Sequence, residues 1–152
     1  MSDSKKFRDW DDRYAASDYL FGTAPNDFLK TVAHQLAPNS QILCLADGEG
    51  RNGVYLAAQG HTVTAVDQSR VGLEKAKKLA QQKQVSVETI KADLAEYDLG
   101  VESWDCIVSI FFHIPSEVRA NIYPRIIAAL KPGGSLILES YTPNQLNHKT
   151  GG

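Results

Sequence analysis

Short apolar runs alternate with helix-like patterns through the middle of the chain. Residues 41–46 form a nearly continuous apolar run that ends just before Gly48, which is typical of a strand buried on both faces. The same kind of pattern predicts further strands at residues 61–66, 86–90, 104–110 and 135–141. Helical patterns lie between them at residues 52–59, after a Ser69 cap and after a Ser116 cap. This alternation predicts right-handed βαβ units.

The predicted fold is therefore α/β, an open, mainly parallel, doubly wound sheet with helices on both faces. Residues 131–134, Lys-Pro-Gly-Gly, are the sharpest turn signal and are expected to precede the last strand. The helix after Ser69 has an apolar face and a charged face, and we expect the charged face to be solvated. The residues of the charged face are Glu74, Lys75, Lys77 and Lys78.

The length of 152 residues predicts a single domain over residues 1–152. We divide it into an N-terminal segment with a helix at residues 1–30, a βα core at residues 41–141 and a polar tail at residues 142–152. Apolar residues make up 43% of the chain, which is enough for a buried core and excludes disorder as the main state.

Charge and cysteine usage narrow the class of protein further. The net charge of −2 lacks the positive field that phosphate-backbone binding needs, so no nucleic-acid partner is expected. No apolar stretch reaches the length of a membrane span and the first ten residues have no apolar centre, so we expect a soluble protein without a membrane partner or signal peptide. Cys44 and Cys106 lie in apolar runs without metal-type spacing, which predicts buried free thiols, no metal site and a cytoplasmic location.

A glycine-containing loop follows the first predicted strand. It reads Asp-Gly-Glu-Gly-Arg-Asn over residues 47–52, and ligands of such sheets bind beyond the carboxyl ends of the strands where the strand order reverses. About twenty residues later Asp67 ends the second strand, where its carboxylate can accept both hydrogen bonds of a ribose diol. Two alternatives stay open: Gly48 and Gly50 could simply close a tight turn, and Asp67 could cap the next helix in place of Ser69. The pattern favours a nucleoside-cofactor site.

The chemistry of the loop bears on which cofactor it suits. Over residues 47–52 it shows two glycines, and we interpret it as lacking the third glycine of the dinucleotide fingerprint. A pyrophosphate would also meet the carboxylates of Asp47 and Glu49. A cationic ligand without phosphates therefore fits the loop better than NAD does.

Five segments together resemble the motifs of the class I S-adenosylmethionine-dependent methyltransferases. They are residues 42–52, 63–67, 92–94, 104–109 and 130–139. The resemblance implies S-adenosylmethionine as the cofactor and a binding site built from the residues that match these motifs. Those residues are Ala46, Asp47, Gly48, Glu49, Gly50, Arg51, Asn52, Asp67, Gln68, Asp93, Leu94 and Ser109. It further implies that Asp67 binds the ribose and that Asp93 and Leu94 contact the adenine.

Residues 10–14 and 19–29 resemble the amino-terminal segment of the tellurite-resistance type of methyltransferase. This resemblance implies a lid that folds over the cofactor and includes Tyr14, Tyr19 and Phe21. It also implies a small acceptor, for which a thiol or chalcogen is plausible. An aromatic-rich segment that simply packs on the sheet is an equal alternative.

Three features depart from the family pattern. Cys44 stands where many members carry an acidic residue, although Asp47 could supply a charge nearby. Ala46 stands where they carry glycine, and we expect ordinary backbone angles there. The family continues after the fifth strand with a helix and two more strands, which the tail at residues 142–152 does not provide. We therefore expect a chain that lacks the family's C-terminal part, with the fifth strand as an unprotected edge open to self-association or to a partner chain.

The expected function is methyl transfer from S-adenosylmethionine to a small molecule. In-line displacement of a neutral leaving group depends mainly on alignment, so few catalytic residues are needed. His113 is the candidate base, with a packed or capping histidine as the alternative. Arg51 could hold an anionic group or pair with Asp47 or Glu49. The alternative functions are a non-catalytic cofactor-binding fragment and a NAD-dependent dehydrogenase.

Overall fold

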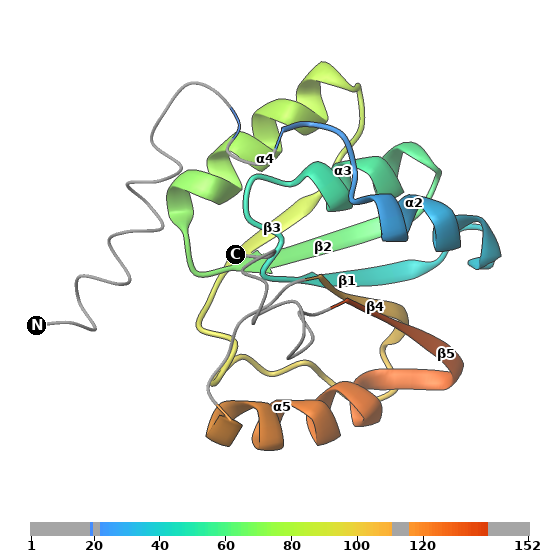
Figure 1. Ribbon diagram of the computed structural model, residues 1–152, viewed down its shortest axis with the longest axis vertical. Coiled ribbons are helices and arrows are strands. Elements are labelled where there is room, and N and C mark those ends of the chain that lie inside the picture. The colour runs from blue at the N-terminus through green and yellow to red at the C-terminus, as the bar shows by residue number, and fades with distance from the viewer. Residues whose placement is uncertain (1–18, 20–21, 111–115, 140–152) are drawn as a thin grey trace, which may run out of the picture.

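The computed structural model describes residues 19, 22–110 and 116–139 (Figure 1). The elements in chain order are α2 Asp27–Val32, a short 3-10 helix Ala33–Gln35, β1 Gln41–Leu45, α3 Arg51–Ala58, β2 Thr62–Asp67, α4 Arg70–Gln82, β3 Glu88–Lys91, β4 Trp104–Ile110, α5 Ser116–Ala129 and β5 Leu130–Glu139. Within these ranges no helix is both long and apolar enough to cross a membrane.

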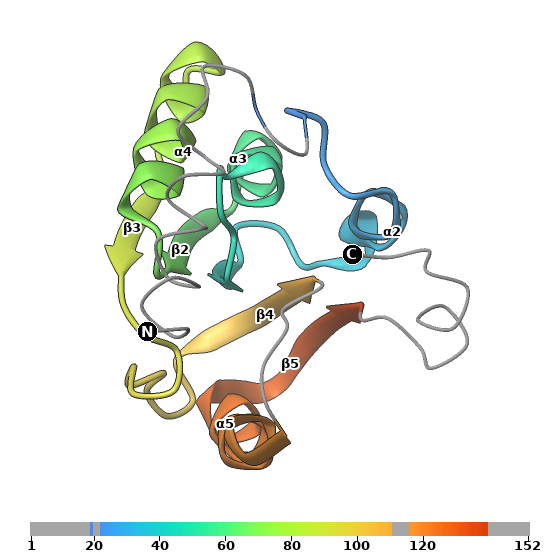
Figure 2. The same cartoon turned by 60° about the vertical axis from the view of Figure 1, so that its left-hand side comes forward.

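The five strands form one sheet in the order β3-β2-β1-β4-β5, and every neighbouring pair is parallel. Helices α2, α3 and α4 cover one face and α5 lies on the other, as two views of the molecule show (Figures 1 and 2). The predicted open, parallel, doubly wound sheet is confirmed. The strand order reverses between β1 and β4, so the ligand crevice of such a sheet belongs at the carboxyl ends of these two strands.

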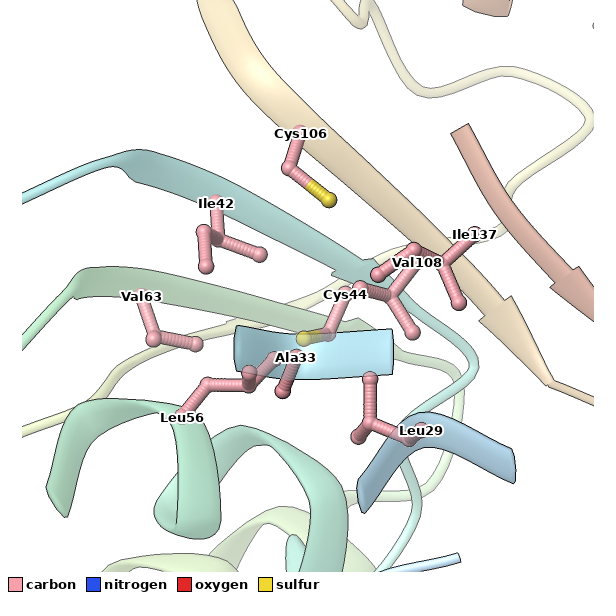
Figure 3. Packing of buried hydrophobic residues seen from close by; sticks show 9 residues of the cluster. All are labelled: Leu29, Ala33, Ile42, Cys44, Leu56, Val63, Cys106, Val108 and Ile137. Atoms are coloured by element: carbon pink, nitrogen blue, oxygen red, sulfur yellow. The ribbon is translucent and has the colours of Figure 1, made fainter. Parts of the chain in front are cut away.

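Each face of the sheet has its own apolar core. The core beneath α2 and α3 brings Leu29 and Leu56 against Cys44, Cys106 and Val108 of the central strands (Figure 3). Both cysteines are buried free thiols, as predicted. Burial raises the pKa of Cys106 to about 12 and raises that of Cys44 as well, so both thiols stay protonated near neutral pH and serve as packing residues.

The last helix and strand differ from the prediction. The turn expected at residues 131–134 lies inside β5, where Trp104 is opposite Leu130 but Cys106 is already opposite Ser135. The extra residues form a bulge, and Gly133, with φ +80°, supplies the backbone angle that the bulge needs. Helix α5 begins at Ser116 itself, so that residue is the first of the helix rather than its cap.

Candidate functional site

The residues that the sequence assigned to a site lie at or after the ends of four parallel strands. Ala46 and the loop to Gly50 follow β1, Gln68 follows β2, and Asp93 and Leu94 follow β3. Asp67 is the last residue of β2, Ser109 is the penultimate residue of β4, and Arg51 and Asn52 open α3. Parallel strands end at one edge of the sheet, so the fold brings these loops to the same edge. His113 lies outside the described residues.

Asp67 ties the loop after β1 to the end of β2. Its carboxylate accepts hydrogen bonds from the backbone N–H of Gly48 and of Ser69, both at 2.8 Å, and the residue is 7% exposed. The helix cap is Ser69, whose hydroxyl accepts from the Gly72 N–H at 3.1 Å. The alternative in which Asp67 caps α4 in place of Ser69 is therefore wrong.

The loop after β3 joins the same cluster. The Ala92 N–H donates to the carbonyl oxygen of Asp67 at 3.0 Å. The Asp93 carboxylate is exposed and accepts from the Ala95 N–H at 2.9 Å, while Leu94 is buried in the core on the α5 side of the sheet. The ends of β1, β2 and β3 are thus linked by hydrogen bonds through Asp67.

Ala46 does not have the ordinary backbone angles that we expected. Its φ is +54°, in the left-handed region that favours glycine. The carbonyl oxygen of Val66 accepts the Ala46 N–H at 2.8 Å, so sheet pairing with β2 continues into the turn and fixes the backbone there. The methyl group therefore carries a conformational cost at the entrance to the loop.

Replacing Ala46 with glycine is expected to raise the free energy of unfolding by about 0.5–1 kcal/mol. Relief of left-handed strain, about 1–2 kcal/mol, outweighs the greater freedom of glycine in the unfolded chain. Urea denaturation measures the change. The matched control is Ala58→Gly at an exposed position of α3, where the same substitution should destabilise by roughly 1 kcal/mol. Equal losses in both variants would show that Ala46 is not strained.

The interpretation that the loop lacks a third glycine is wrong. Gly53 follows Gly48 and Gly50 at the full fingerprint spacing and lies in the first turn of α3. Its N–H donates to the Asp47 carboxylate at 3.2 Å, and a Cβ there would lie 2.6 Å from the same oxygen. The glycine spacing therefore does not argue against a dinucleotide cofactor. Only the acidic residues of the loop still argue against one.

Lys75 neutralises one of those acidic residues, so the expectation that it lies on a solvated face is wrong. Lys75 is 9% exposed, and its Nζ forms an ion pair with the carboxylate of Glu49, which is 5% exposed. Lys75 lies three residues after Gly72 and four before Leu79, both buried, so helical spacing places it at the margin of the apolar face. That spacing is the signal in the sequence that indicates its burial.

The same lysine contacts the N-terminal segment. The Tyr19 hydroxyl donates to the backbone carbonyl of Lys75 at 3.0 Å, and the Lys75 Nζ lies 5.0 Å from the centre of the Tyr19 ring. Burial raises the pKa of Tyr19, and the Glu49 charge adds to the rise. Of the aromatic residues expected in a lid, Tyr19 therefore packs on α4, while Tyr14 and Phe21 lie outside the described residues.

Asp47 is the other acidic residue of the loop. Burial raises its pKa to about 7, and the charge of Asp67 acts in the same direction. The Gly53 N–H and the Arg51 charge oppose that rise. Asp47 is therefore poised to change charge near neutral pH beside Asp67, and a cationic group bound here would favour its ionised form.

Wild-type stability is expected to decrease as pH rises from 4 to 7. The folded chain holds the Asp47 proton up to about pH 7, whereas an aspartate in the unfolded chain releases it near its ordinary pKa of 3.8. The folded state then binds more protons between these values, so the free energy of unfolding decreases with rising pH. Asp47→Asn, whose side-chain oxygen can still accept from the Gly53 N–H, should remove this contribution to the pH dependence of stability. Urea unfolding at pH 5 and pH 7.5 tests it, and parallel pH dependence in the two proteins would contradict it.

Two further residues, Asn26 and Glu139, connect the loop to β5. The Asn26 N–H donates to the Asn52 side-chain oxygen at 2.8 Å, and the Asn26 amide donates to the Glu139 carboxylate at 3.1 Å. The Asn26 oxygen also caps α2 by accepting from the Leu29 N–H. Asn52 thus holds the N-terminal segment, and Glu139 marks the β5 end of the same edge.

Comparison with known proteins identifies the family in which this arrangement of strands and loops occurs. A family model described as "Methyltransferase domain" matches residues 42–134. The chain is 32% identical over 132 residues to "Uncharacterized methyltransferase YodH" of Bacillus subtilis (strain 168), with 82% of this chain and 56% of that protein covered. It spans about half the length of that curated relative and of the similar one from Geobacillus.

Solved structures share the fold at low sequence identity. A SAM-dependent methyltransferase from Thiobacillus denitrificans in complex with S-adenosyl-L-homocysteine has a TM-score of 0.66 at 23% identity, over 84% of this chain and 52% of that one. Phosphoethanolamine N-methyltransferase 1 of Haemonchus contortus has a TM-score of 0.71 at 14% identity, over 87% of this chain and 31% of that one. Because the matched residues include the loops after β1, β2 and β3 together with strand β4, this chain belongs to the methyltransferase domain family.

Proposed function

We propose that the chain binds S-adenosylmethionine at the carboxyl edge of the sheet and transfers its methyl group to a small molecule. The observation that carries the proposal is the position of Asp67, whose carboxylate joins the loops after β1 and β2 at the edge where such sheets bind ligands. A carboxylate offers about four acceptor positions, so Asp67 can hold Gly48 and Ser69 and also accept from a ribose diol.

The remaining parts of the cofactor have counterparts along this edge. Asp93, on the loop tied to Asp67, provides an exposed carboxylate for the exocyclic amine of adenine, while the neighbouring Leu94 side chain is packed in the core on the α5 side. Asp47 provides a carboxylate that ionises near neutral pH for the cationic sulfonium and ammonium groups. Gln68, Gly50 and the first turn of α3 complete the proposed cofactor site.

Methyl transfer from a sulfonium needs alignment more than it needs a strong base. A thiol or chalcogen acceptor reaches its anionic form near neutral pH, which reduces the need for a base further. The solved Haemonchus protein, bound to phosphoethanolamine and S-adenosylhomocysteine, shows that this fold accommodates a small acceptor. We propose an acceptor of the thiol or chalcogen class, as in the tellurite-resistance type, with His113 as the candidate base.

Calorimetry with S-adenosylhomocysteine and with NAD tests the cofactor assignment. Binding of the first without the second is expected, and the reverse would overturn the proposal. A methyl-transfer assay with S-adenosylmethionine, comparing simple thiols, simple amines and RNA, then tests the acceptor class. Methylation of the thiols is expected. Cofactor binding without transfer to any of these would favour the non-catalytic alternative.

We also propose self-association through β5. Among the residues that the structure describes, this strand is at one edge of the sheet, and Leu136 and Leu138 on it are 37% and 39% exposed. An apolar strand with an unpaired edge is a template for pairing with another chain. Light scattering at micromolar concentration should show dimers or larger species, and Leu138→Lys should shift them toward monomers. Val101→Lys, at a 74% exposed position outside any strand, is the control. A monomeric wild type would contradict the proposal.

A further inference from the structure

Arg125 of α5 holds the loop that follows β3. The Arg125 guanidinium donates to the carbonyl oxygen of Tyr97 at 2.7 Å, to that of Leu94 at 3.0 Å and to that of Ala95 at 3.3 Å. Its Nε donates to the Asn121 side-chain oxygen at 3.1 Å, which orients the group along the helix. The rigid, planar donor set of arginine suits three carbonyls that converge in one turn.

The turn held by Arg125 is the one that carries Asp93. Its own hydrogen bonds run from the Glu96 and Tyr97 N–H groups to the Asp93 carbonyl and from the Ala95 N–H to the Asp93 carboxylate. The preceding residue, Ala92, donates to Asp67. The loop is therefore fixed to β2 on one side and to α5 on the other, with Asp93 between the two attachments. In both ribbon views it runs from β3 to the neighbourhood of α5 (Figures 1 and 2).

The groups that accept hydrogen bonds from Arg125 indicate its role. Carboxylates of Asp93, Glu96 and Asp98 lie on the same loop, yet every hydrogen bond that Arg125 makes within the described residues goes to a carbonyl or to the Asn121 amide. The Asp93 carboxylate therefore stays out of an ion pair with Arg125. Helix α5 has its own anchors in Ile122 and Ile126, which are buried against the sheet, so its packing does not depend on the arginine.

We propose that Arg125 is a positioning residue, which sets the loop so that the Asp93 carboxylate meets the adenine of the cofactor. This inference rests on the proposed function and adds a determinant of its specificity for adenine. The Asp93 carboxylate accepts from the exocyclic amine of adenine, and an analogue without that amine leaves the acceptor unpaired. Arg125 acts on this discrimination through the backbone that it holds, without touching the ligand.

The test compares two ligands, S-adenosylhomocysteine and its inosine analogue, by calorimetry on the full chain. Arg125→Gln should reduce the preference for adenine by about five- to tenfold, which is in the range expected for the loss of one ordinary hydrogen bond. Arg125→Lys, which keeps the charge but not the planar fork, should lie between wild type and Arg125→Gln. Lys78→Gln removes a positive charge from an exposed position of α4 and should leave the preference unchanged.

Thermal unfolding of the same variants separates positioning from simple stabilisation. An equal loss of affinity for both ligands, together with a lower Tm, would overturn the inference and leave Arg125 a structural residue. If Arg125→Gln does not fold, Asn121→Ala removes the group that orients Nε and should give a smaller shift of the same sign; no shift there also overturns it. Failure of the wild type to bind either ligand would instead overturn the proposed function, so the two failures are distinguishable.

Discussion

Replacing Gly50 with alanine is expected to lower the free energy of unfolding by about 2–5 kcal/mol, the sum of left-handed strain and overpacking. The residue has φ +91°, and a Cβ there would lie 2.5 Å from the Ala76 Cβ and 2.8 Å from the Ala76 Cα. Helix α4 approaches the loop so closely that only glycine fits between them. Neither atom of Ala76 can rotate away, so the backbone of α4 or of the loop must move. The measurement is urea denaturation of the purified variant.

Gly60 provides a matched control for that variant. Its φ is +98°, but a Cβ there would have nothing within 4 Å. Gly60→Ala should therefore cost only the strain, roughly 1–2 kcal/mol. The difference between the two variants isolates the close approach of α4. Adding Ala76→Gly to Gly50→Ala should recover part of the loss, because it removes the nearer of the two contacts. An equal loss of stability in the two alanine variants would show that α4 moves away from the loop at little energetic cost.

Replacing Asp67 with alanine is expected to weaken S-adenosylhomocysteine binding by about ten- to a hundredfold, the loss of a charge-assisted hydrogen-bonding group. The same substitution leaves the buried N–H groups of Gly48 and Ser69 without their acceptor, which should also reduce stability by about 1–3 kcal/mol for each group. Calorimetry measures the affinity and urea denaturation the stability. Because the loop after β1 loses its attachment, the two effects should appear together.

Asp105→Ala is the control for the Asp67 variant. The Asp105 carboxylate also accepts a backbone N–H, that of Gln41 at 2.7 Å, but it does so at the amino-terminal start of β1 and β4, the opposite edge of the sheet. Asp105→Ala should reduce stability and leave the affinity for the cofactor unchanged. A folded Asp67→Ala protein that binds S-adenosylhomocysteine like wild type would remove Asp67 from the cofactor site and leave it a purely structural residue.

The fold could be predicted because its signals are local. Runs such as residues 104–110 coincide with the observed strand, and Ser69 caps the helix that it was expected to cap. A chain in which strands alternate with helices is then compatible with only a few topologies. The turn signal at residues 131–134 was local too, but pairing with β4 kept those residues in the strand as a bulge. Whether such a segment forms a free turn or pairs with a distant strand cannot be predicted from its local pattern alone.

The sequence alone was enough to predict the strand and helix pattern, the position of the glycine loop and the place of Asp67 at a strand end, because each depends on residues close together along the chain. The packed structure was needed to show that Lys75 is buried against Glu49, that Ala46 is left-handed and that Arg125 holds the loop after β3. Each of these depends on which backbone segment or charged group from a distant part of the chain lies opposite the residue in the fold. Burial and hydrogen-bonding partners are properties of the packed chain, and the sequence of a single element does not contain them.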